Sequence, residues 1–331
     1  MKKIFAYNLI IFFLLIFIIE ILARSFNLSP LVGLDKGLLD LSSVPHQNNK
    51  NIVSQAFNKK VYTDQYGFRV PNSNYNYGSS KKSILILGDS VSFGVGVREE
   101  ESIFGKLRVD FKNLNFYNSS VVGYNIKNYH QILNKYQNIE NLDEVIVFFC
   151  INDIHLEQSI KFANNIEEKK EEKFNIILFL KKNIYFSKIN NFLRDKSVFY
   201  VWFKNNLSNT SERYFTYSFE TYGDKNKIIP IKKYLNQIQL LTKKNNLNLS
   251  VIILPYEFQT RETNCQGSYI KPQKEISNIL SKLQIEYFDY TQEFCKFENP
   301  SDLFLKYDPV HLSKKGHEYV SRLLKRDVLS K

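Results

Sequence analysis

Apolar residues in this chain gather in short runs that alternate with amphipathic segments. Five runs have the length and the bounding residues of buried parallel strands, namely 83–87, 114–118, 144–149, 249–254 and 285–289. The spacing of apolar residues predicts helices over 98–110, 126–136, 231–244, 274–283 and 315–328. Strands that alternate with helices in this way are typical of βαβ units. The sequence therefore predicts an α/β domain with a five-stranded parallel sheet.

The alternation stops after Asp153 and resumes near residue 231. Within the interruption, 167–173 is a run of Glu and Lys that is typical of a solvated helix face. The segments 175–180 and 189–203 are apolar and aromatic at mixed spacing, which suggests helices that cap one end of the sheet. We therefore predict one domain over 61–331 with a helical insertion at about 155–230.

The N-terminus carries two lysines followed by an almost wholly apolar run, 4–22. A helix of about 20 residues crosses the hydrocarbon core of a bilayer, and lysines before it favour a cytoplasmic N-terminus. No small-x-small cleavage pattern follows, which favours a retained signal anchor over 1–23 rather than a cleaved signal peptide. Glu20 near the outer end of the run is tolerable because it can reach the interface. We expect a single-pass cell-membrane protein whose main domain lies outside the cytoplasm.

The segment 24–60 shows little periodicity and is rich in Asn, Ser and Gln, so we predict a juxtamembrane spacer. His46 lies within it and is expected at the surface. The next residues, 61–69, are predicted to form a hairpin that docks onto the domain.

Composition narrows the function classes. The net charge of +12 comes from 45 Lys and Arg against 33 Asp and Glu, but these charges are scattered and no recognition motif accompanies them. We therefore predict no nucleic-acid partner. Cys150 lies in a predicted buried strand, whereas Cys265 and Cys295 lie in loop-like sequence and are predicted to form a disulfide outside the cytoplasm. No Cys/His spacing resembles a zinc site, and we predict neither a metal nor a cofactor.

Polar residues follow the carboxyl ends of the predicted strands, which is where ligands bind in open parallel sheets. Because these ends meet at one rim, we expect the groups that follow them to converge there. They are Gly88-Asp89-Ser90 after the first strand, Gly123 after the second, Asn152-Asp153 after the third and Asp308-Pro309-Val310-His311 beyond the fifth.

These residue types suit acyl transfer through a serine. Ser90 would supply a hydroxyl exposed at a strand-to-helix turn, His311 a base, and Asp308 the group that orients that base. The oxyanion that develops would be bound by the Ser90 N–H, the Gly123 N–H and the Asn152 side-chain amide. Each motif alone is weak, and their order at successive strand ends carries the prediction.

The four blocks resemble those of the SGNH/GDSL hydrolase family, over about residues 60–330. The resemblance implies a three-layer flavodoxin-like α/β fold and metal-free ester chemistry, with the triad and the oxyanion donors just named. The N-terminal anchor and the 66–69 element look like a membrane-anchored branch of the family. Two positions depart from its pattern: Val91 replaces Leu, and Cys150 replaces the Gly that precedes the Asn152 block.

The resemblance leaves two functions open. The first is a serine esterase that hydrolyses an O-acyl ester, most plausibly O-acetyl, on an envelope or extracellular glycan through an acyl-enzyme. The alternative is an O-acyltransferase that passes the acyl group to a sugar hydroxyl with the same triad. A non-catalytic glycan-binding module has no need of the base, and a long-chain lipase would require a wide apolar groove.

Overall fold

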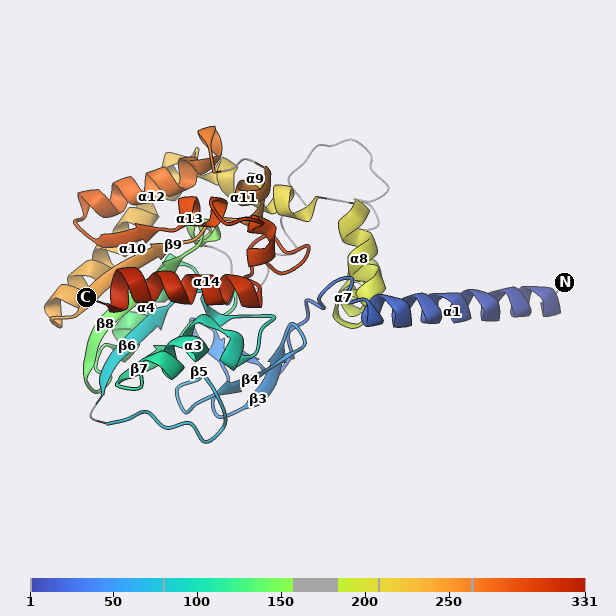
Figure 1. The fold of residues 1–331 in the computed structure, drawn as a ribbon, viewed down its shortest axis with the longest axis horizontal. Coiled ribbons are helices and arrows are strands. Elements are labelled where there is room, and N and C mark those ends of the chain that lie inside the picture. The colour runs from blue at the N-terminus through green and yellow to red at the C-terminus, as the bar shows by residue number, and fades with distance from the viewer. Residues whose placement is uncertain (1, 80, 157–183, 208, 263–264, 331) are drawn as a thin grey trace.

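The computed structural model describes residues 2–79, 81–156, 184–207, 209–262 and 265–330. A long helix, α1 (Lys2–Ser25), projects from an α/β body (Figure 1). Among the described helices, α1 is the one long and apolar enough to cross a membrane, with a mean hydropathy of 2.6. The charged run 167–173 and the apolar segment 175–180 lie outside the described residues.

Five parallel strands form the centre of the body in the order β10-β9-β8-β6-β7. Relative to their order in the chain this is 2-1-3-4-5, the order of flavodoxin-like sheets. All five predicted strands are confirmed to within two residues. They are β6 (Lys82–Leu87), β7 (Leu114–Asn118), β8 (Leu142–Phe149), β9 (Asn248–Ile253) and β10 (Glu286–Asp289).

The helices between these strands form two further layers. Right-handed crossovers from β6 to β7 and then back past β6 to β8 place α3 and α4 on opposite faces of the sheet. Accordingly α14 packs on α3, and α10 packs on α4 (Figure 1). The helices are α3 (Ile103–Asp110), α4 (Ile126–Tyr136), α10 (Lys225–Lys244), α12 (Lys271–Lys282) and α14 (Lys314–Leu324), followed by the π-helical turn Lys325–Leu329.

The sheet is larger than the sequence predicts. Three antiparallel strands extend it beyond β7 to eight strands, so it is mixed rather than parallel throughout. These strands lack the apolar runs that reveal a buried strand, because polar residues stand at many of their positions: β3 reads VSQA and β4 reads KKVYT. They are β5 (Arg69–Val70), β4 (Lys59–Thr63) and β3 (Val53–Ala56).

The segment 24–60 differs from the expected spacer. It contains β3 and a small two-stranded ribbon of β1 (Leu39–Asp40) and β2 (Gln47–Asn48). Leu38 and Ala56 are fully buried in a second apolar cluster with Phe93, next to the first turn after β6. Much of this segment therefore belongs to the body and touches the residues that follow the central strand.

The insertion does not simply cap the sheet. Its helix α8 packs on α1 and on α7, outside the body, whereas α9 packs on α11 and on the turn that follows β8. A pattern of apolar residues predicts a helix with a buried face, but it does not show which element covers that face. For this reason the prediction that α7 and α8 cap the sheet was wrong. The bounds are α7 (Ile184–Lys196), α8 (Val198–Leu207), α9 (Thr210–Thr221) and α11 (Glu257–Glu262).

Short elements and one disulfide complete the fold. Cys265 and Cys295 are joined, with their Cα atoms 6.1 Å apart, which confirms the predicted pairing. Cys150 is a free, buried thiol, as predicted. The remaining elements are α2 (Ser90–Phe93) and α13 (Thr291–Cys295), with the 3-10 turns η1 (Glu99–Glu101), η2 (Ile151–Ile154), η3 (Gly267–Ile270) and η4 (Pro300–Leu303).

Candidate active site

Ser90 begins the short helix α2 directly after β6. Asp89 caps this helix, since its Oδ1 accepts the Val91 N–H at 2.9 Å. The turn requires glycine at position 88, because a Cβ there would lie 1.9 Å from Ser92 Oγ. Ser90 is 9% exposed, so it is more enclosed than a side chain at an open turn.

The structure brings Ser90, His311 and Asp308 together. His311 Nε2 lies 2.8 Å from Ser90 Oγ, and His311 Nδ1 lies 2.8 Å from Asp308 Oδ2. An ionised carboxylate can only accept, so Nδ1 carries the proton and Nε2 is left to accept from the Ser90 hydroxyl. The other oxygen of Asp308 accepts the backbone N–H groups of Val310 and His311, at 2.9 and 2.7 Å, which fixes the carboxylate in place.

The electrostatics of this pair suit a base. Burial by itself would lower the pKa of His311, but the Asp308 carboxylate outweighs it and raises that pKa above the ordinary 6.5. Burial would also raise the pKa of Asp308, and the bonds from His311 and the backbone hold it below the ordinary value instead. Asp308 therefore stays ionised over the pH range in which His311 gains and loses its proton.

Asn152 lies at the carboxyl end of the neighbouring strand β8, in η2. Its Nδ2 donates to Asp89 Oδ2 at 3.1 Å, which ties it to the turn that carries Ser90. Cys150, the departure from the family pattern, is 2% exposed, and its Sγ lies 3.8 Å from the other oxygen of Asp89. The thiol thus packs against Asp89 and leaves the Asn152 amide beside the turn that carries Ser90.

Gly123 lies in a tight turn after β7. Tyr124 N–H donates to Val121 C=O at 3.2 Å, and Gly123 has a φ of 82°. Val122 is not among the residues with positive φ, so this is a type II turn, which favours glycine at its third position. This turn is bonded to the turn that carries Ser90, since Val121 N–H donates to Gly88 C=O at 3.3 Å.

His46 fastens the same turn from the other side. Its Nε2 lies 2.9 Å from Val122 C=O, and since a carbonyl only accepts, Nε2 carries the proton. In a trans peptide the C=O and the following N–H point in opposite directions, so this bond directs the Gly123 N–H away from His46. The expectation of a surface residue was wrong, because His46 is 8% exposed and burial lowers its pKa.

Phe57 is a second contribution from the segment 24–60. Its ring meets the His311 ring edge to face, with 5.1 Å between the centroids. It lies in the turn between β3 and β4 at a φ of 49°, which non-glycine residues seldom adopt. No sequence pattern predicts the role of His46 or Phe57, because both contacts join positions far apart in the chain.

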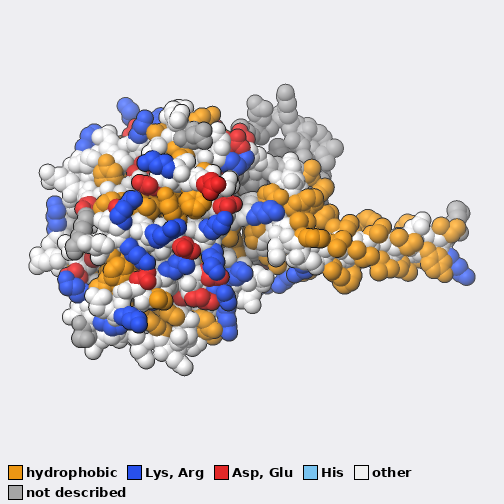
Figure 2. Space-filling model, in the orientation of Figure 1, with side chains coloured by type: hydrophobic (Ala, Val, Ile, Leu, Met, Phe, Trp, Pro, Cys, Tyr) orange, Lys and Arg blue, Asp and Glu red, His pale blue; other side chains and the backbone are white. Residues whose placement is uncertain are grey.

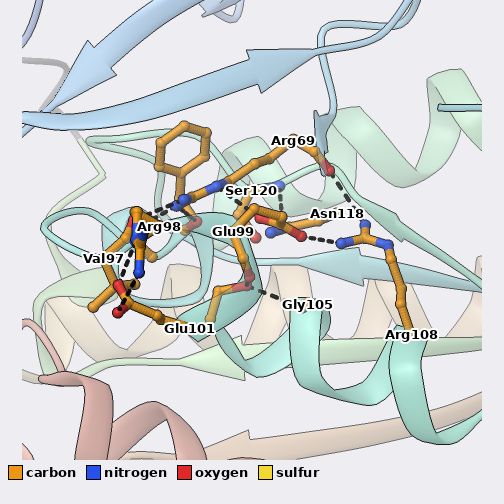
Figure 3. A network of polar contacts seen from close by, with 12 residues as sticks. Arg69, Val97, Arg98, Glu99, Glu101, Gly105, Arg108, Asn118 and Ser120 are labelled. Atoms are coloured by element: carbon orange, nitrogen blue, oxygen red, sulfur yellow. Dashed lines mark hydrogen bonds and ion pairs between the residues drawn. The ribbon is translucent and has the colours of Figure 1, made fainter. Parts of the chain in front are cut away.

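A buried ionic network supports the far end of α2 (Figure 3). The Arg69 guanidinium donates to the carbonyls of Phe93, Gly94 and Val97, and its Nε pairs with Glu99 at 2.8 Å. Arg108 contacts the second oxygen of Glu99 and donates to Phe116 C=O. Arg69 is fully buried, so the network fixes the backbone that follows α2.

A groove with a cavity volume of about 830 Å³ borders the loop that carries Asp308 and His311. Tyr307 and Ser313, which flank that pair in the chain, line it. Residues at the end of α8, before α9 and at its start also line the groove. The lining combines side chains that can hydrogen-bond, among them Asn205, Asn209, Thr210 and Lys314, with the apolar Phe304 and Leu305.

Solved structures with a similar fold include a lipase/acylhydrolase from Enterococcus faecalis, at 16% identity and a TM-score of 0.44 over 75% of this chain and 95% of that one. A member of the lipolytic G-D-S-L family from Veillonella parvula matches at 11% identity and 0.42, over 75% and 98%. A catalytic mutant of the acetylxylan esterase Axe2 from Geobacillus stearothermophilus matches at 14% and 0.41, over 74% and 94%. No protein-family model and no curated protein matches the chain. We therefore infer the function from the residues and the geometry of the site.

Proposed function

We propose that this protein is a serine esterase of the SGNH/GDSL type that works through an acyl-enzyme. The observation that carries the proposal is the chain of two 2.8 Å contacts from Ser90 through His311 to Asp308. A serine hydroxyl, an imidazole with its proton on the far nitrogen and an ionised carboxylate are the parts that nucleophilic acyl transfer requires.

In the proposed reaction, Ser90 Oγ attacks the carbonyl carbon of the ester while His311 Nε2 takes the hydroxyl proton. The tetrahedral intermediate collapses when the bond to the alcohol oxygen breaks, and His311 returns the proton to that oxygen. Water then attacks the acyl-serine with His311 again as the base, which releases the acid and restores Ser90. Asp308 stabilises the imidazolium at both stages.

The charge on the carbonyl oxygen would be bound by three donors, the Ser90 N–H, the Gly123 N–H and the Asn152 amide. Two further residues would position them. Asp89 holds the Asn152 amide, and His46 holds the Val122–Gly123 peptide. This assignment gives the buried His46 a role in the oxyanion site without any contact with substrate.

We propose that the substrate is an O-acyl group, specifically O-acetyl, on an envelope or extracellular glycan. The apolar helix α1 supports a membrane anchor with the body outside the cytoplasm, where acylated glycans are present and cytosolic thioesters are not. The groove that borders the Asp308–His311 loop has polar side chains that suit sugar hydroxyls, among them Asn205, Asn209 and Thr210, and it also presents apolar side chains such as Phe304 and Leu305.

The test uses the full chain in detergent, with the Ser90→Ala variant as the matched control. Release of acid from p-nitrophenyl acetate and from O-acetylated polysaccharide, absent from the control, would support the proposal. A sugar acceptor is added in a parallel arm, because an O-acyltransferase would form an acylated sugar there instead of free acid. Equal activity of the protein and the control would overturn the proposal.

A further inference from the structure

The helices α7 and α8 expose large apolar side chains to solvent. Ile189 and Phe192 on α7 are 56% and 63% exposed, and Phe203 and Leu207 on α8 are 47% and 71% exposed. Figure 2 shows apolar side chains continuing from α1 onto the helices beside its end. In water, exposed apolar surface of this kind is unfavourable and marks a site of interaction.

A polar bond fixes this helix pair to α1. The Glu20 carboxylate accepts the backbone N–H groups of Val198 and Phe199 at 2.9 and 3.1 Å, and the Ser197 hydroxyl at 2.7 Å. Glu20 therefore caps the first turn of α8, where free N–H groups favour a negative charge. Arg24 pairs with Glu20 at 2.8 Å and donates to Lys196 C=O, which closes the joint.

The position of this joint along α1 sets the depth of α8. Glu20 lies near the outer end of the apolar run of α1, with only Ile21 to Ala23 between it and Arg24, so its level is close to the outer boundary of the hydrocarbon if α1 spans the bilayer. The first turn of α8 lies at that level. Aromatic side chains of α8, among them Phe199 and Trp202, and the exposed Lys188 and Lys196 match the residues that membrane interfaces favour.

We propose that α7 and α8 rest on the outer surface of the bilayer that anchors α1, with their exposed apolar side chains among the lipid chains and their lysines at the headgroups. The proposal rests on the membrane anchor but not on the catalytic assignment. Continuity with α1 favours lipid over a second copy of the chain as the occupant of this face.

The contact would also orient the catalytic site. The helix α9 follows α8 and reaches the turn that carries Asn152, since Tyr217 stacks on His155 and the Tyr222 hydroxyl donates to Ile151 C=O at 3.0 Å. The groove beside His311 is walled by residues at the end of α8 and the start of α9. A fixed α8 would therefore hold that groove at a set distance from the membrane.

The chain provides its own probe, because Trp202 on α8 is its single tryptophan. The full chain, carrying Ser90→Ala so that activity plays no part, is reconstituted into phosphatidylcholine/phosphatidylglycerol vesicles with bromine on the acyl chains. We expect the brominated lipids to quench the fluorescence of Trp202. The quenching should be stronger when the bromine lies near the headgroup than when it lies near the bilayer centre. We expect the double variant Phe192→Ser/Phe203→Ser to lose most of this quenching while it remains in the vesicles after alkaline extraction. Val109→Ser, at an apolar side chain on α3 that is 68% exposed, is the matched control and should change nothing.

Three results would overturn the proposal. The first is that brominated lipid does not quench the fluorescence of Trp202, although the protein stays in the vesicles after alkaline extraction. Another is release of the full chain by that extraction, because no bilayer would then lie beside α8. The third is that the parent forms a dimer and shows no quenching, while the double variant is a monomer. That result would assign the apolar face to a second copy of the chain.

Discussion

The two sides of the candidate active site are built differently. On the base side, Ser90, His311 and Asp308 contact one another directly, and the chain from hydroxyl to carboxylate needs no further residue. On the oxyanion side, Asn152 and Gly123 do not bond to each other, and each is held by a separate support. Asp89 holds the first, and His46 holds the peptide of the second.

This difference predicts different responses to substitution. In the proposed mechanism the groups of the base side act in sequence on one proton, so the loss of one would remove the function of the set. The donors on the oxyanion side would act in parallel on one charge, so each loss would subtract only its own share, and loss of a support would subtract less.

Ser90→Ala should give the largest loss. Without the hydroxyl no acyl-enzyme forms, and we expect kcat/KM for p-nitrophenyl acetate to fall by ~10³-fold or more. The variant should keep the melting temperature of the parent, because the side chain only loses one oxygen. Ser42→Ala, at an exposed serine, is the control and should retain full activity. Activity of Ser90→Ala at the parent level would remove Ser90 as the nucleophile.

Asn152→Ala should give the next largest loss. The amide would bind the oxyanion rather than the ground-state carbonyl, so we expect kcat to fall by ~10²-fold or more with little change in KM. Steady-state kinetics on the same ester separate the two constants. A variant that raises KM alone would make Asn152 a residue that positions substrate, and the two sides would then differ in function as well as in construction.

The sequence alone was sufficient for the base side and the parallel strands. The strands β6, β8 and β9 contain runs of apolar residues, and two motifs directly follow such runs at the rim of the sheet, Gly88-Asp89-Ser90 after β6 and Asn152-Asp153 after β8. The order of the strands then brings Ser90 and Asn152 to neighbouring strand ends, β6 and β8. Local sequence patterns therefore predict those site residues that the ends of the parallel strands position.

The supports could not be predicted in the same way. His46 and Phe57 lie in short strands and turns without apolar periodicity, and their partners Val122 and His311 are far away in the chain. The pair α7–α8 shows the same limit, because its pattern predicts helices but not that Glu20 would fix α8 to α1. Long-range contacts made by single side chains decide these features.

The pH dependence tests whether the base side is a single unit. The base must be neutral, so kcat/KM should rise with pH, about tenfold per unit below the pKa of His311, and then level off. Asp308 raises that pKa above 6.5, so the midpoint should lie above pH 6.5. In Asp308→Asn the positive charge loses its partner, and the residual activity should show a midpoint at lower pH. A midpoint that this substitution leaves unchanged would mean that another group titrates.

His46→Ala should give the smallest effect, and it tests the supports of the oxyanion side. The substitution removes one neutral hydrogen bond from the Val122–Gly123 peptide, worth about 1 kcal/mol, so we expect kcat to fall about fivefold with KM unchanged. A boronate inhibitor, whose tetrahedral adduct places an oxygen in the same hole, should bind more weakly by a similar factor. His46→Gln retains an N–H donor at nearly the same position and should restore both values, whereas a merely destabilised fold would lower the melting temperature without this pattern. Equal kcat and boronate affinity in His46→Ala and the parent would show that the turn keeps its type II form unaided, and that Asn152 alone on this side depends on a support.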